Sequence, residues 1–230
     1  MSPVVGVIGG MGPAATVDFL DRLVRATPAE RDQDHLRVLV DSNPKVPNRN
    51  EALAGTGPSP GPVLAEMALG LERAGADVLV MACNTAHAFS ADIRPAVSIP
   101  FLDMIEATAD RLAGVMDGRG YRVGVLAVDG CLRAGLYQQA LGRRGLEAVL
   151  LDDAGQARLM DAIYRIKAGQ LETARPDIVA LARGFRDVGA VVSACTELPM
   201  ALKRPDLDVT LVDSTDVLVD QVLAFARSHG

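Results

Sequence analysis

The chain contains no tryptophan, and only 3% of its 230 residues are aromatic. Proteins that bind nucleic acids use aromatic rings to stack bases and clusters of Lys and Arg to hold phosphates. Here acidic residues outnumber basic ones, and the net charge is −6. We therefore expect a small-molecule partner and no nucleic-acid partner.

Long apolar runs are also missing. A helix that crosses a bilayer needs about 20 consecutive apolar residues, and no stretch of this sequence approaches that length. The first residues lead directly into a strand-like run, without a basic region and a cleavage site ahead of it. These features predict no signal peptide and no membrane contact, so we expect a cytoplasmic protein.

Only three cysteines occur, at positions 83, 131 and 195. They form no CxxC pair, and the spacing from Cys83 to His87 alone is a weak metal signal, because a structural zinc site needs four ligands. A disulfide framework is not expected in a reducing compartment. With 49% hydrophobic and 23% charged residues, the composition is that of an ordinary globular protein.

Apolar, strand-like runs alternate with helical patterns along the whole chain. The predicted strands are 4–9, 36–40, 77–82, 99–102, 122–128, 148–151, 190–194 and 209–212. The helices predicted between them include 85–93 and 132–141. Near-continuous apolar strands separated by helices are typical of parallel sheets that are covered on both faces. The sequence therefore predicts an α/β protein. Segment 42–60, rich in Pro, Asn and Gly, is predicted to be a long substrate loop or lid.

The two halves of the chain resemble each other. Residues 5–8 (VGVI) match residues 123–126 (VGVL), and Gly-Ala precedes the cysteine-bearing strand of each half. This repeat predicts two pseudo-symmetric α/β domains with mostly parallel four-stranded sheets. We place the first at residues 1–102 plus 207–230 and the second at 103–206. Ligands of such sheets bind at the carboxyl ends of strands, so we expect the active site in the cleft between the domains.

Cys83 and Cys195 each end an apolar strand-like run and precede small polar residues. A lone buried cysteine most often acts as a small hydrophobic residue, but two at corresponding places of a repeat favour a function. A helix N-terminus lowers the pKa of a thiol and makes it a useful base. One thiolate can remove a proton from one face of a carbon while the other thiol donates to the opposite face, which inverts a stereocentre.

Several segments together resemble one known family, the aspartate/glutamate racemase superfamily, and within it the aspartate racemase-like branch. They are residues 7–19, 41–49, 81–87, 166–169 and 195–198. The resemblance spans essentially the whole chain. It implies a racemase that needs neither pyridoxal phosphate nor any other cofactor or metal, and that is commonly a homodimer.

The resemblance assigns the two catalytic bases to Cys83, facing the D-enantiomer, and Cys195, facing the L-enantiomer. It also assigns substrate binding to six residues: Met11, Arg49, Asn84, Thr85, Lys167 and Thr196. In these terms Asn84, Thr85 and Thr196 hold the α-carboxylate, and Met11 lines the pocket. Arg49 and Lys167 approach a side-chain carboxylate, which suits an amino acid such as aspartate or glutamate.

One segment departs from the family pattern. Where the family has Thr-x-Gly-Thr after the first strand of its second half, this chain has Val128-Asp129-Gly130-Cys131. Valine removes a hydroxyl, and a thiol is a weaker donor than the hydroxyl that it replaces. The substrate therefore stays open among aspartate, glutamate and another amino acid. Cys131 itself is predicted to pack at a helix start.

Two other functions are compatible with parts of the sequence. Residues 10–15 match the permissive G-x-G-x-x-A fingerprint of nucleotide-binding folds, and Asp41 ends the following strand. The second is an amino-acid-binding protein without turnover.

Two further polar residues closely follow the cysteines in the sequence. Glu197 is open between a carboxylate that supports Cys195 and a residue that complements a helix dipole. His87 is predicted to cap or pack a helix.

Overall fold

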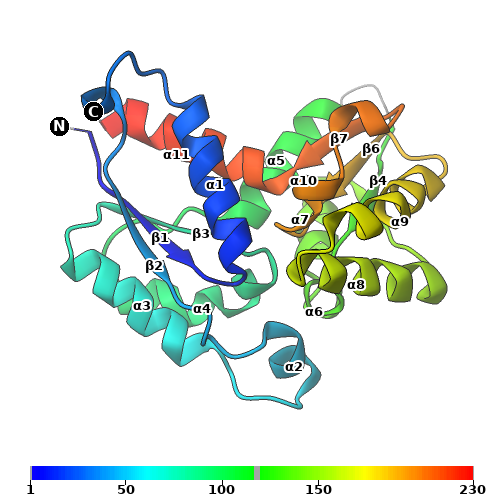
Figure 1. Cartoon of the computed structure of the whole chain (residues 1–230), viewed down its shortest axis with the longest axis horizontal. Helices are drawn as coiled ribbons and strands as arrows, with labels where there is room; N and C mark the ends of the chain where they lie inside the picture. The colour runs from blue at the N-terminus through cyan, green and yellow to red at the C-terminus, as the bar shows by residue number, and fades with distance from the viewer. Residues whose placement is uncertain (1, 117–119, 230) are drawn as a thin grey trace. The chain divides into compact units, whose positions relative to one another are not determined.

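The computed structural model describes residues 2–116 and 120–229. Its contacts divide the chain into two compact units, Met1–Met104 with Thr215–Gly230, and Ile105–Ser214. Each unit contains one parallel sheet with helices packed against it (Figure 1). The predicted α/β class is therefore confirmed. Within the described residues, no helix has the length and apolar character needed to span a bilayer.

The sheet of the first unit has three strands. β1 (Val5–Gly9) lies between β2 (Val38–Ser42) and β3 (Val78–Met81), and both neighbours run parallel to it. The expected fourth strand at 99–102 is reduced to one parallel bridge between Leu79 and Phe101. Its two hydrogen bonds join the amide of Leu79 to the carbonyl of Pro100 and the amide of Leu102 to the carbonyl of Leu79. Proline has no N–H to continue such a ladder, so the pairing stops there.

Side chains alternate between the two faces of the sheet along each strand, and β1 and β3 are buried on both faces. Ile8, Leu79 and Met81 pack with α3 (Gly61–Arg73) in one apolar cluster. Val5, Val7, Val78 and Val80 pack on the opposite face with α1 (Pro13–Ala26) and α11 (Ser214–His229). The sheet is therefore covered on both sides, which explains why its strands are apolar without alternation in the sequence.

The segment after β2 is more ordered than predicted. Instead of one continuous loop from 42 to 60, it contains α2 (Arg49–Ala54). The Asn48 side chain accepts a hydrogen bond from the amide of Asn50 at the start of this helix, and Gly55, with φ 74°, ends it in the left-handed conformation. The local capping residues are sufficient to form this short helix. The remaining short elements of the unit are η1 (Asp32–Asp34), η2 (Thr85–Phe89), α4 (Ser90–Ile93) and η3 (Arg94–Ala96).

The sheet of the second unit has four parallel strands in the order β5-β4-β6-β7. They are β4 (Arg122–Leu126), β5 (Glu147–Val149), β6 (Ala190–Ser193) and β7 (Thr210–Asp213). The domain boundaries drawn from the sequence placed residues 207–214 with the first domain. In the structure β7 pairs with β6 along its whole length, and the contact-based boundary therefore lies after Ser214.

The helical segments that go with this second sheet along the chain are α5 (Met104–Met116), α6 (Asp129–Arg133), α7 (Leu136–Gly142), α8 (Asp153–Lys167), α9 (Leu171–Gly184), α10 (Leu198–Ala201) and η4 (Arg204–Asp206). A single helix was predicted over 132–141, but α6 and α7 are separate. Gly135 lies between them in the left-handed region, with φ 66°, which a continuous helix does not allow.

The two sheets repeat one arrangement. In each, the central strand has the next strand of the chain on one side and the cysteine-bearing strand on the other. Ile8 of β1 pairs with Met81 of β3, and Leu126 of β4 pairs with Ser193 of β6. The repeat seen in the sequence therefore corresponds to a repeated strand order and a repeated register.

Glycine occupies matching places in the two central strands. A Cβ atom at Gly6 would lie 2.7 Å from Cδ2 of Leu79 and 2.9 Å from Cβ of Ala76. A Cβ at Gly124 would lie 2.7 Å from two ring carbons of Phe185. Neighbouring side chains fill the space over each glycine, so both positions require the smallest residue for packing.

Gly6→Ala is expected to lower the free energy of unfolding by about 1–3 kcal/mol, because the added methyl group overpacks the core. Gly70→Ala, within α3, is the matched control, since its Cβ would meet nothing within 4 Å. It is expected to be neutral or to stabilise by up to about 1 kcal/mol. Chemical denaturation of both variants checks this, and equal stabilities would contradict the packing role of Gly6.

Candidate active site

The two predicted bases occupy the same topological position. Cys83 is the second residue after β3, and Cys195 is the second residue after β6. Each therefore lies at the carboxyl end of the strand beside the central strand of its own sheet. Ligand sites of parallel α/β sheets lie at such strand ends. Both cysteine residues are buried, with 6% of their surface exposed.

Cys83 is followed by buried polar residues. Asn84 and Thr85 are both buried, and the chain then forms one stretch of 3₁₀ helix, η2, before α4. A single short α-helix over 85–93 was predicted. The turn begins tightly, because the amide of Cys83 bonds to the carbonyl of Met81 at 2.9 Å. The structure thus brings Cys83, Asn84 and Thr85 together at one strand end.

His87 stabilises this turn by two hydrogen bonds to the backbone. Its Nδ1 lies 2.8 Å from the carbonyl oxygen of Cys83, and its Nε2 accepts a hydrogen bond of 3.2 Å from the amide of Met104. Nε2 can accept only if the proton is on Nδ1, so Nδ1 donates to Cys83. Burial lowers the pKa of His87, which keeps the ring neutral. Both ring nitrogens are engaged, so the predicted packing role is confirmed and a general-base role is not supported.

Cys195 has a different environment. Its Sγ donates to Oε2 of Glu197 at 3.0 Å, and the Thr196 hydroxyl lies 3.5 Å from the same oxygen. Burial raises the pKa of the Cys195 thiol well above its usual range, and the nearby Glu197 charge adds to this effect. The sequence predicted that a helix N-terminus would lower this pKa. That prediction is wrong for Cys195, because α10 has only four residues and a carboxylate faces the sulfur.

Lys167, the last residue of α8, approaches the same carboxylate. Its Nζ lies 3.4 Å from Oε1 of Glu197, and its side chain is 38% exposed. Oε1 is buried and accepts no hydrogen bond of standard geometry among the described residues, so the ammonium interacts with it as a nearby point charge. The sequence predicted that Lys167 would meet a substrate carboxylate; in the structure it faces a carboxylate of the protein.

Arg49 and Met11 lie close together in the first unit. Nη1 of Arg49 donates to the carbonyls of Pro47 at 2.9 Å and Val46 at 3.2 Å, and Nη2 lies 3.5 Å from the carbonyl of Met11. Met11 is buried beside the strand end. Arg49 is the first residue of α2, so the segment predicted as a loop positions this guanidinium through its own carbonyl groups.

The departing segment of the second unit is buried. Val128 precedes α6 and is covered, and Cys131 lies inside α6 with no exposed surface. Tyr137 of α7 is likewise fully buried. The prediction that Cys131 packs at a helix start is therefore confirmed.

The glycine-rich turn after β1 is filled by the protein itself. The Thr16 hydroxyl accepts the amide hydrogen of Gly10 at 2.9 Å, and a Cβ at Gly10 would lie 2.4 Å from the backbone nitrogen of Asn43. A dinucleotide site needs such amides and such space for a pyrophosphate. The turn instead packs against the segment that follows β2, so the nucleotide-binding interpretation is not supported.

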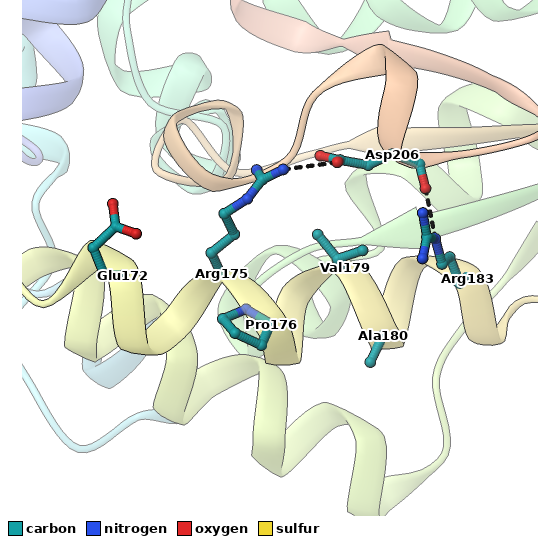
Figure 2. A pocket seen from close by; sticks show the side chains of 7 residues that line it. All are labelled: Glu172, Arg175, Pro176, Val179, Ala180, Arg183 and Asp206. Atoms are coloured by element: carbon teal, nitrogen blue, oxygen red, sulfur yellow. Dashed lines mark hydrogen bonds and ion pairs between the residues drawn. The ribbon is translucent and has the colours of Figure 1, made fainter.

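A separate groove of about 560 Å³ runs along α9. Figure 2 shows two of its polar side chains, Arg175 and Arg183, directed at Asp206. Nη2 of Arg175 donates to the Asp206 carboxylate at 2.7 Å, and Nε of Arg183 donates to the Asp206 carbonyl at 2.7 Å. Arg175 also donates to the carbonyl of Ala201 at the end of α10. These two arginines bind the segment that follows Cys195. The side chains that line the groove therefore have a structural role.

Glu197 is the functional candidate that sequence reasoning left undecided. Its position two residues after Cys195 was visible, but only the folded backbone turns the carboxylate back onto the sulfur. Among residues 2–116 and 120–229, no group of three or more His, Cys, Asp or Glu side chains is arranged to hold a metal ion.

Two repeated parallel α/β units, each with a cysteine at the same strand end, define a racemase type of fold. The model of the Asp/Glu/hydantoin racemase family matches residues 8–222, and the chain belongs to this family. Fold and relatives together support an isomerase of the amino-acid racemase type.

Known relatives match over nearly the whole length. The aspartate racemase of Picrophilus torridus has a TM-score of 0.88 and 32% identity, with 98% of this chain and 94% of that chain covered. An aspartate racemase homologue from Pyrococcus horikoshii OT3 has a TM-score of 0.76 and 25% identity, with coverage of 99% and 100%. The broad specificity amino-acid racemase of Bacillus subtilis (strain 168) is 24% identical, with 96% of each chain covered.

His87→Ala is expected to lower the free energy of unfolding by about 2–4 kcal/mol near pH 8, because a buried carbonyl and a buried amide lose their partner. Since burial lowers the pKa of His87 below its ordinary value of 6.5, the unfolded chain binds a proton that the folded chain does not. The wild type therefore loses stability as the pH falls below about 6.5, and the variant lacks this loss.

Urea denaturation between pH 8 and pH 5 measures the difference between wild type and variant, which should narrow toward acidic pH. His229→Ala, at the exposed end of α11, is the control and should change stability by less than about 1 kcal/mol at every pH. A His87→Ala difference that stays constant or widens in acid would contradict a buried neutral ring.

Proposed function

We propose that the protein is a cofactor-independent racemase that interconverts L- and D-amino acids by a two-base mechanism. The observation that carries this proposal is the equivalent placement of Cys83 and Cys195 at the carboxyl ends of corresponding strands in two repeated units. A racemase must treat the two faces of one carbon alike, and a repeated fold supplies two similar sets of groups. Cys195 acts on the L-enantiomer and Cys83 on the D-enantiomer.

In this mechanism one cysteine, as a thiolate, removes the α-proton and becomes a thiol. The other cysteine, as a thiol, donates its proton to the opposite face of the carbanion and becomes a thiolate. Asn84, Thr85 and Thr196 hold the α-carboxylate through their amide, hydroxyl and backbone donors, which stabilises the charge that develops next to the α-carbon. Both strand ends carry buried polar side chains of this kind.

The substrate is proposed to be aspartate, glutamate or both. Arg49, at the start of α2, and Lys167, at the end of α8, are the cations assigned to a side-chain carboxylate. Lys167 already faces Glu197, but an ammonium has three donors and can serve a second carboxylate. The relatives carry the names aspartate racemase and broad specificity amino-acid racemase, and the Val128 and Cys131 substitutions leave room for the broader range.

We also propose that the enzyme is cytoplasmic and, as the resemblance implies, a homodimer. Sedimentation of the purified protein tests the dimer: a monomer at working concentration would remove that part of the proposal without affecting the chemistry. An amino-acid-binding protein without turnover is the remaining alternative, and the exchange experiment below separates it from an enzyme.

Incubation with each L- and D-amino acid in D₂O is expected to introduce deuterium at the α-carbon of the substrate and to yield both enantiomers. Cys83→Ala and Cys195→Ala should each lower racemisation by at least about 10²-fold, since each removes one obligatory proton carrier. Proton NMR and chiral chromatography measure exchange and configuration. Binding without exchange would support the non-catalytic alternative, and two-way racemisation by either variant would contradict the two-base mechanism.

Iodoacetamide is expected to inactivate the enzyme by alkylating Cys83 and Cys195, and the amino-acid substrate should protect both. Cys131 is an internal control, because its side chain has no exposed surface and its alkylation reports unfolding. Peptide mass mapping locates each adduct. Full activity after both site cysteines are alkylated would return them to a packing role.

A further inference from the structure

Glu197 is a buried carboxylate in contact with the proposed base Cys195. Only 4% of its surface is exposed, and a buried charge is expensive unless other groups compensate it. Its Oε2 faces the Cys195 sulfur at 3.0 Å, and its Oε1 faces the Lys167 ammonium at 3.4 Å. The carboxylate therefore lies between a proton donor and a positive charge.

The first unit has a different residue at the corresponding place. The residue two positions after Cys83 is Thr85, and His87 binds the carbonyl of Cys83 but not its sulfur. The two units therefore differ in the side chain that is available to exchange a proton with the cysteine. The second unit has a carboxylate that contacts its thiol, and the first unit has a hydroxyl in the same sequence position.

The other cations next to this site bind elsewhere. Arg175 of α9 donates to Ala201 and Asp206, and the Lys203 ammonium donates to the carbonyl of Pro199 at 2.6 Å. Lys167 of α8 forms an ion pair with Glu197.

We propose that Glu197 is the proton acceptor of Cys195 and that Lys167 holds the charge of this pair in place. The inference rests on the proposed function, because it concerns the base assigned to the L-enantiomer. In the free protein the sulfur carries the proton and the carboxylate carries the charge. Cys195 is activated when its S–H bond breaks and an O–H bond forms at Oε2 of Glu197.

This step conserves both charge and protons. The negative charge moves from the carboxylate to the sulfur, the pair keeps one negative charge in total, and Lys167 neutralises it before and after the transfer. The thiolate then takes the α-proton. Because burial raises the pKa of the thiol, while Lys167 acts in the opposite direction, the resulting thiolate is a strong base in a covered site.

Glu197→Gln tests the transfer without requiring turnover. The rate of Cys195 alkylation by iodoacetamide, followed by mass mapping at pH 6 to 11, reports the fraction of thiolate. Glutamine has no charge, so the apparent pKa of the thiol is expected to fall by about 1–3. Glu172→Gln, the same substitution at an exposed site on α9, is the matched control and should leave the profile unchanged. An identical profile for wild type and Glu197→Gln overturns the inference.

Two further variants keep the test decisive if Glu197→Gln folds poorly. Glu197→Asp retains a carboxylate, so its alkylation profile should stay nearer to that of the wild type. Lys167→Met removes the positive charge and should move the profile to higher pH. Unchanged profiles for Lys167→Met, or a Glu197→Asp profile shifted as far as that of a neutral residue, overturn the inference.

Turnover provides the second readout. Glu197→Gln is expected to lower kcat by about 10²-fold, because an amide cannot accept the proton of the Cys195 thiol, and to change KM by no more than about threefold. A change in KM as large as the change in kcat would contradict a role in proton transfer. If the alkylation profile shifts but the wild type exchanges no α-proton, the coupling of Glu197 to Cys195 stands and the proposed function fails; α-proton exchange with an unshifted profile gives the reverse result.

Discussion

Parallel pairing of the cysteine-bearing strand with the central strand is the constraint on which the rest of the structure depends. The pairs Ile8–Met81 and Leu126–Ser193 fix where β3 and β6 end. Each cysteine follows two residues later, so its depth at the strand end is set by the register and not by the loop. A slip of one residue would turn every side chain of the strand to the other face, and burial of both faces makes such a slip costly.

Around this common frame the two units have diverged in how they support their thiols. In the first unit both ring nitrogens of the neutral His87 form hydrogen bonds to the backbone, and these bonds fix the turn. In the second unit a carboxylate contacts the sulfur itself and a lysine balances its charge. In the first unit the turn after the strand is thus fixed by hydrogen bonds from a side chain to the backbone. In the second unit charged side chains surround the thiol. This difference matters for the proposed two-base mechanism, which needs one thiol and one thiolate at the start of each turnover.

Much of this arrangement could be predicted from local patterns. Apolar runs that alternate with helical periodicity indicated a parallel α/β fold, and the repeated VGVI and VGVL segments indicated two related units. The predictions failed where a few residues decide the outcome. Pro100 limits a strand to a bridge, Gly135 divides a helix, and Asn48 starts α2 inside an expected loop. Such features depend on single hydrogen bonds and single dihedral angles, which average hydrophobicity does not register.

The amino-acid sequence by itself determined the fold class, the repeat and the two cysteines at strand ends, because these follow from periodicity and order along the chain. Only the tertiary structure decided the state of those cysteines. The pKa of a thiol depends on burial and on charges within a few ångströms, and the charges that act on Cys195 come from Glu197, two residues away, and Lys167 on α8. Folding brings these groups together, so that the buried Cys195 thiol donates a hydrogen bond to Glu197, and Glu197 pairs with Lys167.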